Sequence, residues 1–225
     1  MSRVICGREI RRIHVIDDDP RVRESYLETV TDMGIAGVAV TDPIPDVDSL
    51  FSKIDFANDG IILDYQLNST KYSRYNGDIY GMAAYERNIP FIISSHFQPL
   101  SMEGRRRFIP KAVHIDHLEP DSVTEAFELC IQEYVGKFTI HRCPVRTLVR
   151  IEGLERNGQS CQLNVVVPNW DPHSGVQIRV DLDSIPNLDQ LEKSLHETGE
   201  ARLTAEVNTG AQERSDLFFV NWKLL

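Results

Sequence analysis

The stretch that decides the predicted fold is Ile13-His14-Val15-Ile16-Asp17-Asp18-Asp19-Pro20, near the amino terminus of the 225-residue chain. Its mostly apolar run, residues 13–16, has the length and composition of a buried strand. Asp19 can accept hydrogen bonds from the first free amides of a helix, and Pro20 suits the first helical position. We therefore expect a strand that passes directly into a helix, with acidic side chains at the junction.

The same alternation of strand and helix continues to about residue 137. Apolar runs predict further strands at Ile35–Val40, Gly60–Leu63, Pro90–Ile93 and Phe108–Val113, and helical spacing predicts helices at Asp46–Ala57, 78–87, 100–107 and Asp121–Val135. Strands that are apolar throughout are buried on both faces, and their alternation with helices indicates right-handed crossovers within a parallel sheet. The first half is therefore predicted to be an α/β domain with a doubly wound parallel sheet.

Composition excludes several classes of protein. The net charge is −10 and the isoelectric point is about 5.2, which argues against a general nucleic-acid or acidic-membrane binder. No apolar run approaches the roughly 20 residues that cross a bilayer, so we expect no membrane segment. The four cysteines form no C-x-x-C pair, and we expect a cytoplasmic protein with reduced thiols.

Acidic residues follow two of the predicted strands. Asp17, Asp18 and Asp64 stand at strand ends, where the ligands of parallel sheets bind, so we expect them to share one cleft. Clustered carboxylates suit Mg²⁺, and a carboxylate can act as a nucleophile toward phosphorus. A hydroxyl and an amine, from Ser95 and Lys111 near the next two strand ends, could then meet the charge of a phosphoryl group.

Four segments in order resemble response regulator receiver domains, over about residues 11–137. They are the opening stretch 13–23, the phospho-acceptor strand 60–64, the strand 90–95 that ends in a switch hydroxyl, and the strand 108–111 that ends in lysine. The resemblance implies a flavodoxin-like (βα)₅ fold. It also implies a histidine kinase or a phosphotransfer protein as the phosphodonor, and a partner protein or a second protomer in a homodimer as the reader of the phosphorylated state.

The resemblance also assigns roles to individual residues. Asp64 would accept the phosphoryl group and catalyse its own phosphorylation and dephosphorylation together with Ser95 and Lys111. Mg²⁺ would be held by Asp18, Asp64 and the backbone carbonyl of Gln66, with Asp17 acting through water. Phe108 would be the aromatic switch residue.

Three features depart from the pattern of that family. Ala112 follows the lysine where proline is usual, and a rival alignment places the fifth strand at 113–118 and Glu119 at the lysine's position. Residues 68–76 form an insertion beside Asp64 that could gate access or contact a partner. His96 occupies a position where the family often has a small residue, and its ring could slow hydrolysis of the phosphoryl group.

Residues 145–225 have a different character. Strands are predicted at Val145–Ile151, Gln162–Val167, Val176–Leu182, Ala201–Val207 and Leu217–Leu224, with one helix at Leu188–Glu197. This order is that of a small, partly open barrel such as the OB-fold, and is compatible with other small barrels and α+β folds. It predicts a β-rich output or interaction domain, without resemblance to a known family.

Two other functions remain open at this stage. A degenerate receiver could act as a scaffold that does not depend on phosphorylation. Asp17 and Asp19 could instead supply the nucleophile and the acid of a haloacid-dehalogenase-like phosphatase, although Pro20-Arg21 does not fit the motif of that family.

Overall fold

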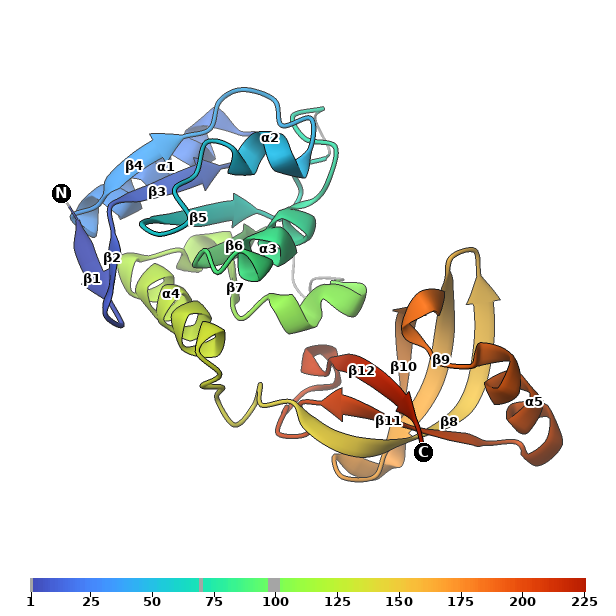
Figure 1. The fold of residues 1–225 in the computed structure, drawn as a ribbon. Coiled ribbons are helices and arrows are strands. Elements are labelled where there is room, and N and C mark those ends of the chain that lie inside the picture. The colour runs from blue at the N-terminus through green and yellow to red at the C-terminus, as the bar shows by residue number, and fades with distance from the viewer. Residues whose placement is uncertain (1, 69–70, 97–101) are drawn as a thin grey trace. The chain divides into compact units, whose positions relative to one another are not determined.

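A computed structural model describes residues 2–68, 71–96 and 102–225 (Figure 1). The chain divides into two compact units. Unit 1 comprises Met1–Leu100 and Phe108–Lys137, and unit 2 comprises Ser101–Arg107 and Phe138–Leu225. Unit 2 therefore contains a short piece of chain that the sequence pattern assigns to the first domain.

A five-stranded parallel sheet forms the centre of unit 1 (Figure 1). Its strands, in spatial order, are β4 (Ala36–Ala39), β3 (Arg12–Ile16), β5 (Asp59–Asp64), β6 (Phe91–Ser95) and β7 (Ala112–His114). The helices are α1 (Pro20–Asp32), α2 (Val47–Phe51), α3 (Gly77–Glu86) and α4 (Pro120–Tyr134). Among these parallel strands the order is 2-1-3-4-5, so the predicted flavodoxin-like fold is confirmed.

Helix α1 begins as its sequence predicts. The carboxylate of Asp19 accepts a hydrogen bond from the backbone amide of Arg21 at 2.8 Å, and Pro20 is the first helical residue. The helix gives way to Gly34, whose φ of +73° is a conformation that glycine adopts at little cost. These local signals fix the direction in which the chain leaves β3, and hence the position of Asp17 and Asp18.

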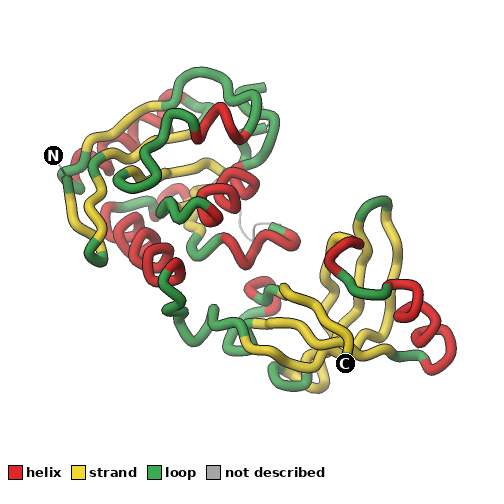
Figure 2. The backbone as a smooth tube through the Cα atoms, viewed as in Figure 1, coloured by secondary structure: helices red, strands yellow, loops and turns green. Residues whose placement is uncertain are grey.

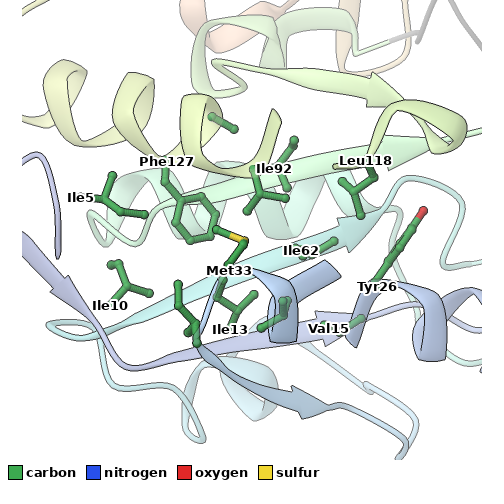
Figure 3. Packing of buried hydrophobic residues seen from close by; sticks show 14 of the residues in the cluster. Ile5, Ile10, Ile13, Val15, Tyr26, Met33, Ile62, Ile92, Leu118 and Phe127 are labelled. Carbon is green, nitrogen blue, oxygen red and sulfur yellow. The ribbon is translucent and has the colours of Figure 1, made fainter. Parts of the chain in front are cut away.

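Helices α1 and α4 cover one face of the sheet with a single apolar cluster (Figure 3). Phe127 of α4 lies directly over Gly60 of β5, where an added Cβ would fall 2.2 Å from the aromatic ring. Ile5 and Ile10 complete this cluster from an antiparallel hairpin, β1 (Arg3–Ile5) and β2 (Arg8–Ile10). The sequence analysis did not foresee the hairpin, because its strands are only three residues long.

Three predicted elements of unit 1 are wrong in extent: one helix and both alternatives for the fifth strand. The helix expected at Asp46–Ala57 is confined to α2. The fifth strand is not Phe108–Val113: Phe108 ends a 3₁₀ helix, η1 (Glu103–Phe108), and β7 begins only at Ala112. The predicted short helix at 100–107 matches η1 in part, and its first two residues lie outside the described ranges. The rival strand at 113–118 is also wrong, because β7 ends at His114 and passes into another 3₁₀ turn, η2 (Ile115–His117).

Unit 2 is built on a five-stranded antiparallel sheet (Figure 2). The spatial order is β10 (Asp171–Asp181), β9 (Ser160–Val167), β8 (Val145–Asn157), β11 (Ala201–Val207) and β12 (Phe219–Leu224), and α5 (Leu188–Thr198) lies between β10 and β11 in the chain. The order of elements is the predicted β-β-β-α-β-β. The long strand β8 pairs with β11 through its first half and with β9 through its second half, and the register shifts between Ile151 and Gly153.

The two halves of β8 share one apolar core. The core includes Trp222, which is 7% exposed, and α5 contributes Leu191 to it. Leu188 and Leu195 of the same helix pack against this cluster, as their helical spacing predicts. Among the described residues, no helix has the length and apolarity needed to cross a membrane.

Candidate functional site

A cavity of about 630 Å³ opens where β3 and β5 end. Its walls come from the β3–α1 junction, from the end of β5 and from the residue after β6. The lining residues are Asp17, Asp18, Asp19, Pro20, Arg21, Val22, Asp64, Gln66 and His96. Because parallel strands end at one edge of the sheet, residues about fifty positions apart in the chain meet here. The predicted convergence of Asp17, Asp18 and Asp64 is present in the structure.

Asp17 is held firmly in the wall of this cavity. Its side chain is nearly buried, at 4% exposure, and its Oδ1 accepts a hydrogen bond from the amide of Asp19 at 2.8 Å. Arg23 donates to the backbone carbonyl of Asp17. The pKa of Asp17 is raised to about 7, mainly by burial, with smaller contributions from the charges of Asp64 and Asp18 and against the lowering effect of the Asp19 amide.

Asp64 is fixed by its own backbone. Its Oδ2 accepts from the amide of Gln66 at 2.7 Å. The pKa of Asp64 is raised to about 6, mainly by burial and to a smaller extent by the charge of Asp18, against the lowering effects of the Gln66 amide and of His96. The start of α3 presses on the same place, because a Cβ on Gly77 would lie 2.1 Å from the carbonyl oxygen of Asp64. Gly77 is thus a positioning residue that the sequence analysis missed.

The donor atoms at this edge fit Mg²⁺. Asp18 and Asp64 offer carboxylate oxygens, and Gln66, whose backbone carbonyl is the expected third ligand, lines the same wall. In the part of the chain that the structure describes, no three His, Cys, Asp or Glu side chains are grouped so as to hold a metal ion. Mg²⁺ needs no such trio, because proteins bind it through one or two carboxylates while it keeps several waters.

Two serines end β6, and they differ in their surroundings. Ser94 stands in register with Asp64, and its Oγ is 2.7 Å from the hydroxyl of Tyr26 on α1. Ser95 is buried at the same edge, in register with His114, but it does not belong to the cavity wall. Burial raises the pKa of Tyr26, which keeps its phenol protonated. The helical spacing of apolar residues predicted only that Tyr26 lies on the apolar face of α1, and it contained no signal for the role of the hydroxyl.

Lys111 does not lie at the carboxyl edge of the sheet, which corrects the expectation drawn from the sequence. It precedes β7, and its carbonyl accepts from the amide of Ile93, two residues before the end of β6. Its ammonium pairs with Glu125 of α4. The rival residue Glu119 does not replace it, because Glu119 caps the start of α4, where its amide donates to Ser122 Oγ at 2.9 Å.

Phe108 is also displaced from its expected strand position. It ends η1, and its ring packs edge-to-face against Tyr85 at 5.8 Å between ring centroids. The role of a strand-borne switch aromatic therefore has no basis in the observed geometry of Phe108.

Imidazoles occupy the strand end where the lysine was expected. His114 closes β7, and its Nε2 lies 3.1 Å from the backbone carbonyl of His96. Its Nδ1 is 3.2 Å from a carboxylate oxygen of Asp116. His96 itself reaches the cavity wall, together with Arg21, whose side chain is 92% exposed.

The described part of the 68–76 insertion packs against the chain between β4 and α2. The amide of Ile44 donates to the carbonyl of Tyr72 at 2.7 Å, and the Tyr72 hydroxyl donates to Val40 at 2.5 Å. Ser73 Oγ lies 2.7 Å from the hydroxyl of Tyr80 on α3. Residues 69–70 are outside the described ranges, so the predicted gate is not tested there.

No family model and no curated protein matches the sequence. Solved structures that resemble the chain include a response regulator receiver domain protein from Clostridium thermocellum, with 12% identity and a TM-score of 0.43 over 56% of this chain and 98% of that one. Another is the response regulator TrrA from Thermotoga maritima in complex with Mg²⁺-BeF, with 17% identity and a TM-score of 0.37 over 47% and 86%.

A third similar structure is the complex of the histidine kinase ThkA with TrrA. It matches with 17% identity and a TM-score of 0.40, over 52% of this chain and 98% of that chain. These matches cover about half of the present chain.

Proposed function

We propose that unit 1 is a phosphorylation-dependent receiver whose acceptor is Asp64, and that the phosphodonor is a phosphohistidine on a histidine kinase or a phosphotransfer protein. The observation that carries this proposal is the meeting of Asp17, Asp18 and Asp64 in one cavity, with the pKa of Asp17 and of Asp64 raised. Carboxylates that destabilise one another in this way bind a divalent cation and, with it, a phosphoryl group.

The transfer requires one nucleophile and one leaving group. An Oδ atom of Asp64 attacks phosphorus, and an O–P bond forms while the P–N bond of the donor breaks. The electron pair of that bond stays on the donor imidazole, which takes up a proton. Bound at Asp18, Asp64 and the Gln66 carbonyl, Mg²⁺ would offset negative charge on the phosphoryl oxygens.

The missing amine affects the rate of this transfer. A phosphoryl group on Asp64 would lie beside the His96 imidazole of the cavity wall, near the strand end that carries Ser95, and would meet no amine from Lys111. Each preorganised donor aimed at developing charge is worth about 3 kcal/mol at well-studied sites. We therefore expect slower phosphorylation than a receiver with a lysine at this edge would show.

The same displacement of Lys111 favours a second function. Unit 1 could be a scaffold that retains the fold and the acidic cluster without accepting a phosphoryl group. For the phosphatase alternative, the structure offers less support, because the Asp19 carboxylate is engaged as the cap of α1.

Labelling decides between the receiver and the scaffold. The full-length protein is incubated with Mg²⁺ and a small phosphodonor, and the modified residue is located by mass spectrometry. We expect a label on Asp64 that is absent in Asp64→Asn and absent without Mg²⁺. Asp42→Asn is the matched control, because Asp42 is an exposed aspartate outside the cavity wall. An unlabelled wild-type protein would leave the scaffold as the better description.

A further inference from the structure

The segment Met102–Arg107 connects two strands of unit 1 but belongs to unit 2. The chain leaves unit 1 after β6, whose last residue is Ser95, and returns at Phe108, just before β7. This connection is where the sequence pattern predicted a helix covering the parallel sheet. Instead, residues 103–108 form the 3₁₀ helix η1.

An ion pair holds this segment on unit 2. Arg106 Nη2 lies 2.5 Å from Asp216 Oδ1, and the two residues are 110 positions apart in the sequence. The backbone carbonyl of Asp216 is itself fixed, because Asn208 Nδ2 donates to it at 3.0 Å. Asn208 also accepts from the amide of Phe218 at 2.8 Å. The Arg106–Asp216 ion pair, called the anchor below, is therefore attached to a hydrogen-bonded part of the β unit.

Arg142 adds a second contact, to the backbone of the segment. Its Nη2 donates to the carbonyl of Arg107 at 2.8 Å, and the whole side chain is buried, at 8% exposure. A buried guanidinium satisfied by main-chain carbonyls holds the path of the chain rather than a particular side chain.

Aromatic rings of unit 2 make a third kind of contact with the segment. The guanidinium of Arg107 lies over the rings of Phe138 and Phe218, at 4.9 and 5.5 Å from their centroids, and Arg142 lies over Phe218 at 5.6 Å. Cations placed over aromatic faces are attracted to them. Three kinds of contact thus fasten the segment to the rest of unit 2, while the chain on either side of it belongs to unit 1.

We propose that Met102–Arg107 is a mechanical link that couples the two units: the β unit holds this part of the connection between β6 and β7 and so biases the carboxyl edge of the unit 1 sheet. This part of the proposal rests on the proposed function: the link transmits phosphorylation of Asp64 to unit 2. It can do so because Ser94, at the end of β6, is in register with Asp64. The coupling is reciprocal, so loosening the anchor alters β6 and β7 as well.

Hydrogen–deuterium exchange on the full-length protein tests the link from both sides. In the unmodified protein, Asp216→Asn removes the charge that Arg106 meets. We expect exchange to become roughly twofold to fivefold faster in the peptides covering 102–108 and in those covering β6 and β7. Arg106→Gln removes the same pair from the other partner and should give the same pattern, and the double variant should add little.

The matched control is Glu192→Gln, which removes the charge of the Arg156–Glu192 ion pair (2.6 Å) on the same unit. This variant should leave hydrogen–deuterium exchange at β6 and β7 unchanged. Unchanged exchange at β6 and β7 in both anchor variants would overturn the link.

The second arm adds Mg²⁺ and beryllofluoride to wild type and to Asp216→Asn. We expect protection at residues 17–22 and 64–66 in both proteins, and a change at 138–142 and 216–218 in wild type only. Protection at the cavity without that change would overturn the link. If the cavity is not protected at all, the proposed function fails, and the anchor variants in the unmodified protein still decide whether the units are coupled.

Discussion

The Asp17→Asn variant is expected to be more stable than the wild-type protein when divalent cations are absent. Asp17 is almost fully buried beside two other carboxylates, and its pKa is about 7 against the ordinary value of 3.8. The folded protein therefore keeps the Asp17 proton up to about pH 7, whereas the unfolded chain releases it near pH 4. The free energy of unfolding of the wild type must fall as the pH rises through this window.

The size of the effect follows from the two pKa values. A pKa difference of about three, at about 1.4 kcal/mol for each pH unit, sets an upper limit of about 4 kcal/mol at pH 8. Asparagine keeps the oxygen that accepts from the amide of Asp19 but carries no charge. We expect a gain of about 2–4 kcal/mol at about pH 8 and almost none at about pH 4.

Urea unfolding in the presence of a chelator measures this gain, and the chain provides a probe for each unit. All seven tyrosines lie in unit 1, and both tryptophans, Trp170 and Trp222, lie in unit 2. The tyrosine transition should therefore move in the variant while the tryptophan transition stays in place as an internal control. Equal stability of the two proteins at pH 8, or the same pH dependence in both, would refute the reasoning. Added Mg²⁺ should stabilise the wild type, because it binds the folded form alone.

Three further outcomes are expected. Gly60→Ala should destabilise unit 1 by about 1–3 kcal/mol, because the new methyl group would enter the ring of Phe127; a tyrosine-monitored midpoint equal to that of wild type would contradict this packing. Lys111→Gln should leave Mg²⁺-dependent labelling of Asp64 unchanged, since the ammonium of Lys111 pairs with Glu125, whereas His114→Lys should increase it by returning an amine to the strand end beside Ser95; the reverse ranking would restore Lys111 to the site. Tyr26→Phe should lower the free energy of unfolding by about 1–2 kcal/mol, because it loses the hydrogen bond to Ser94. Tyr85→Phe is the comparison, because it loses a hydrogen bond to Glu133 away from the cavity. Measured in both variants, labelling of Asp64 shows whether it responds to Tyr26 alone.

Local sequence determined the architecture of unit 1 and most of its acidic site. The run Ile13–Ile16 forms a strand because it is apolar, and α1 starts where Asp19 and Pro20 allow it to start. Once the first and third parallel strands are neighbours in the sheet, residues at their carboxyl ends must meet, whatever chain lies between them. For that reason the sequence alone was enough to predict that Asp17, Asp18 and Asp64 share one cleft.

Tertiary structure alone decided which residue closes the fifth strand and which unit holds the chain before it. β7 is three residues long, too short for its own pattern to fix its start, and its register follows from pairing with β6. That pairing puts His114 at the carboxyl edge of the sheet, whereas Lys111 lies before β7 and pairs with Glu125. Likewise, the place of Arg106 depends on Asp216, 110 residues further along. Contacts at such separations leave no periodic trace in the sequence, because neither partner's neighbours reveal the other.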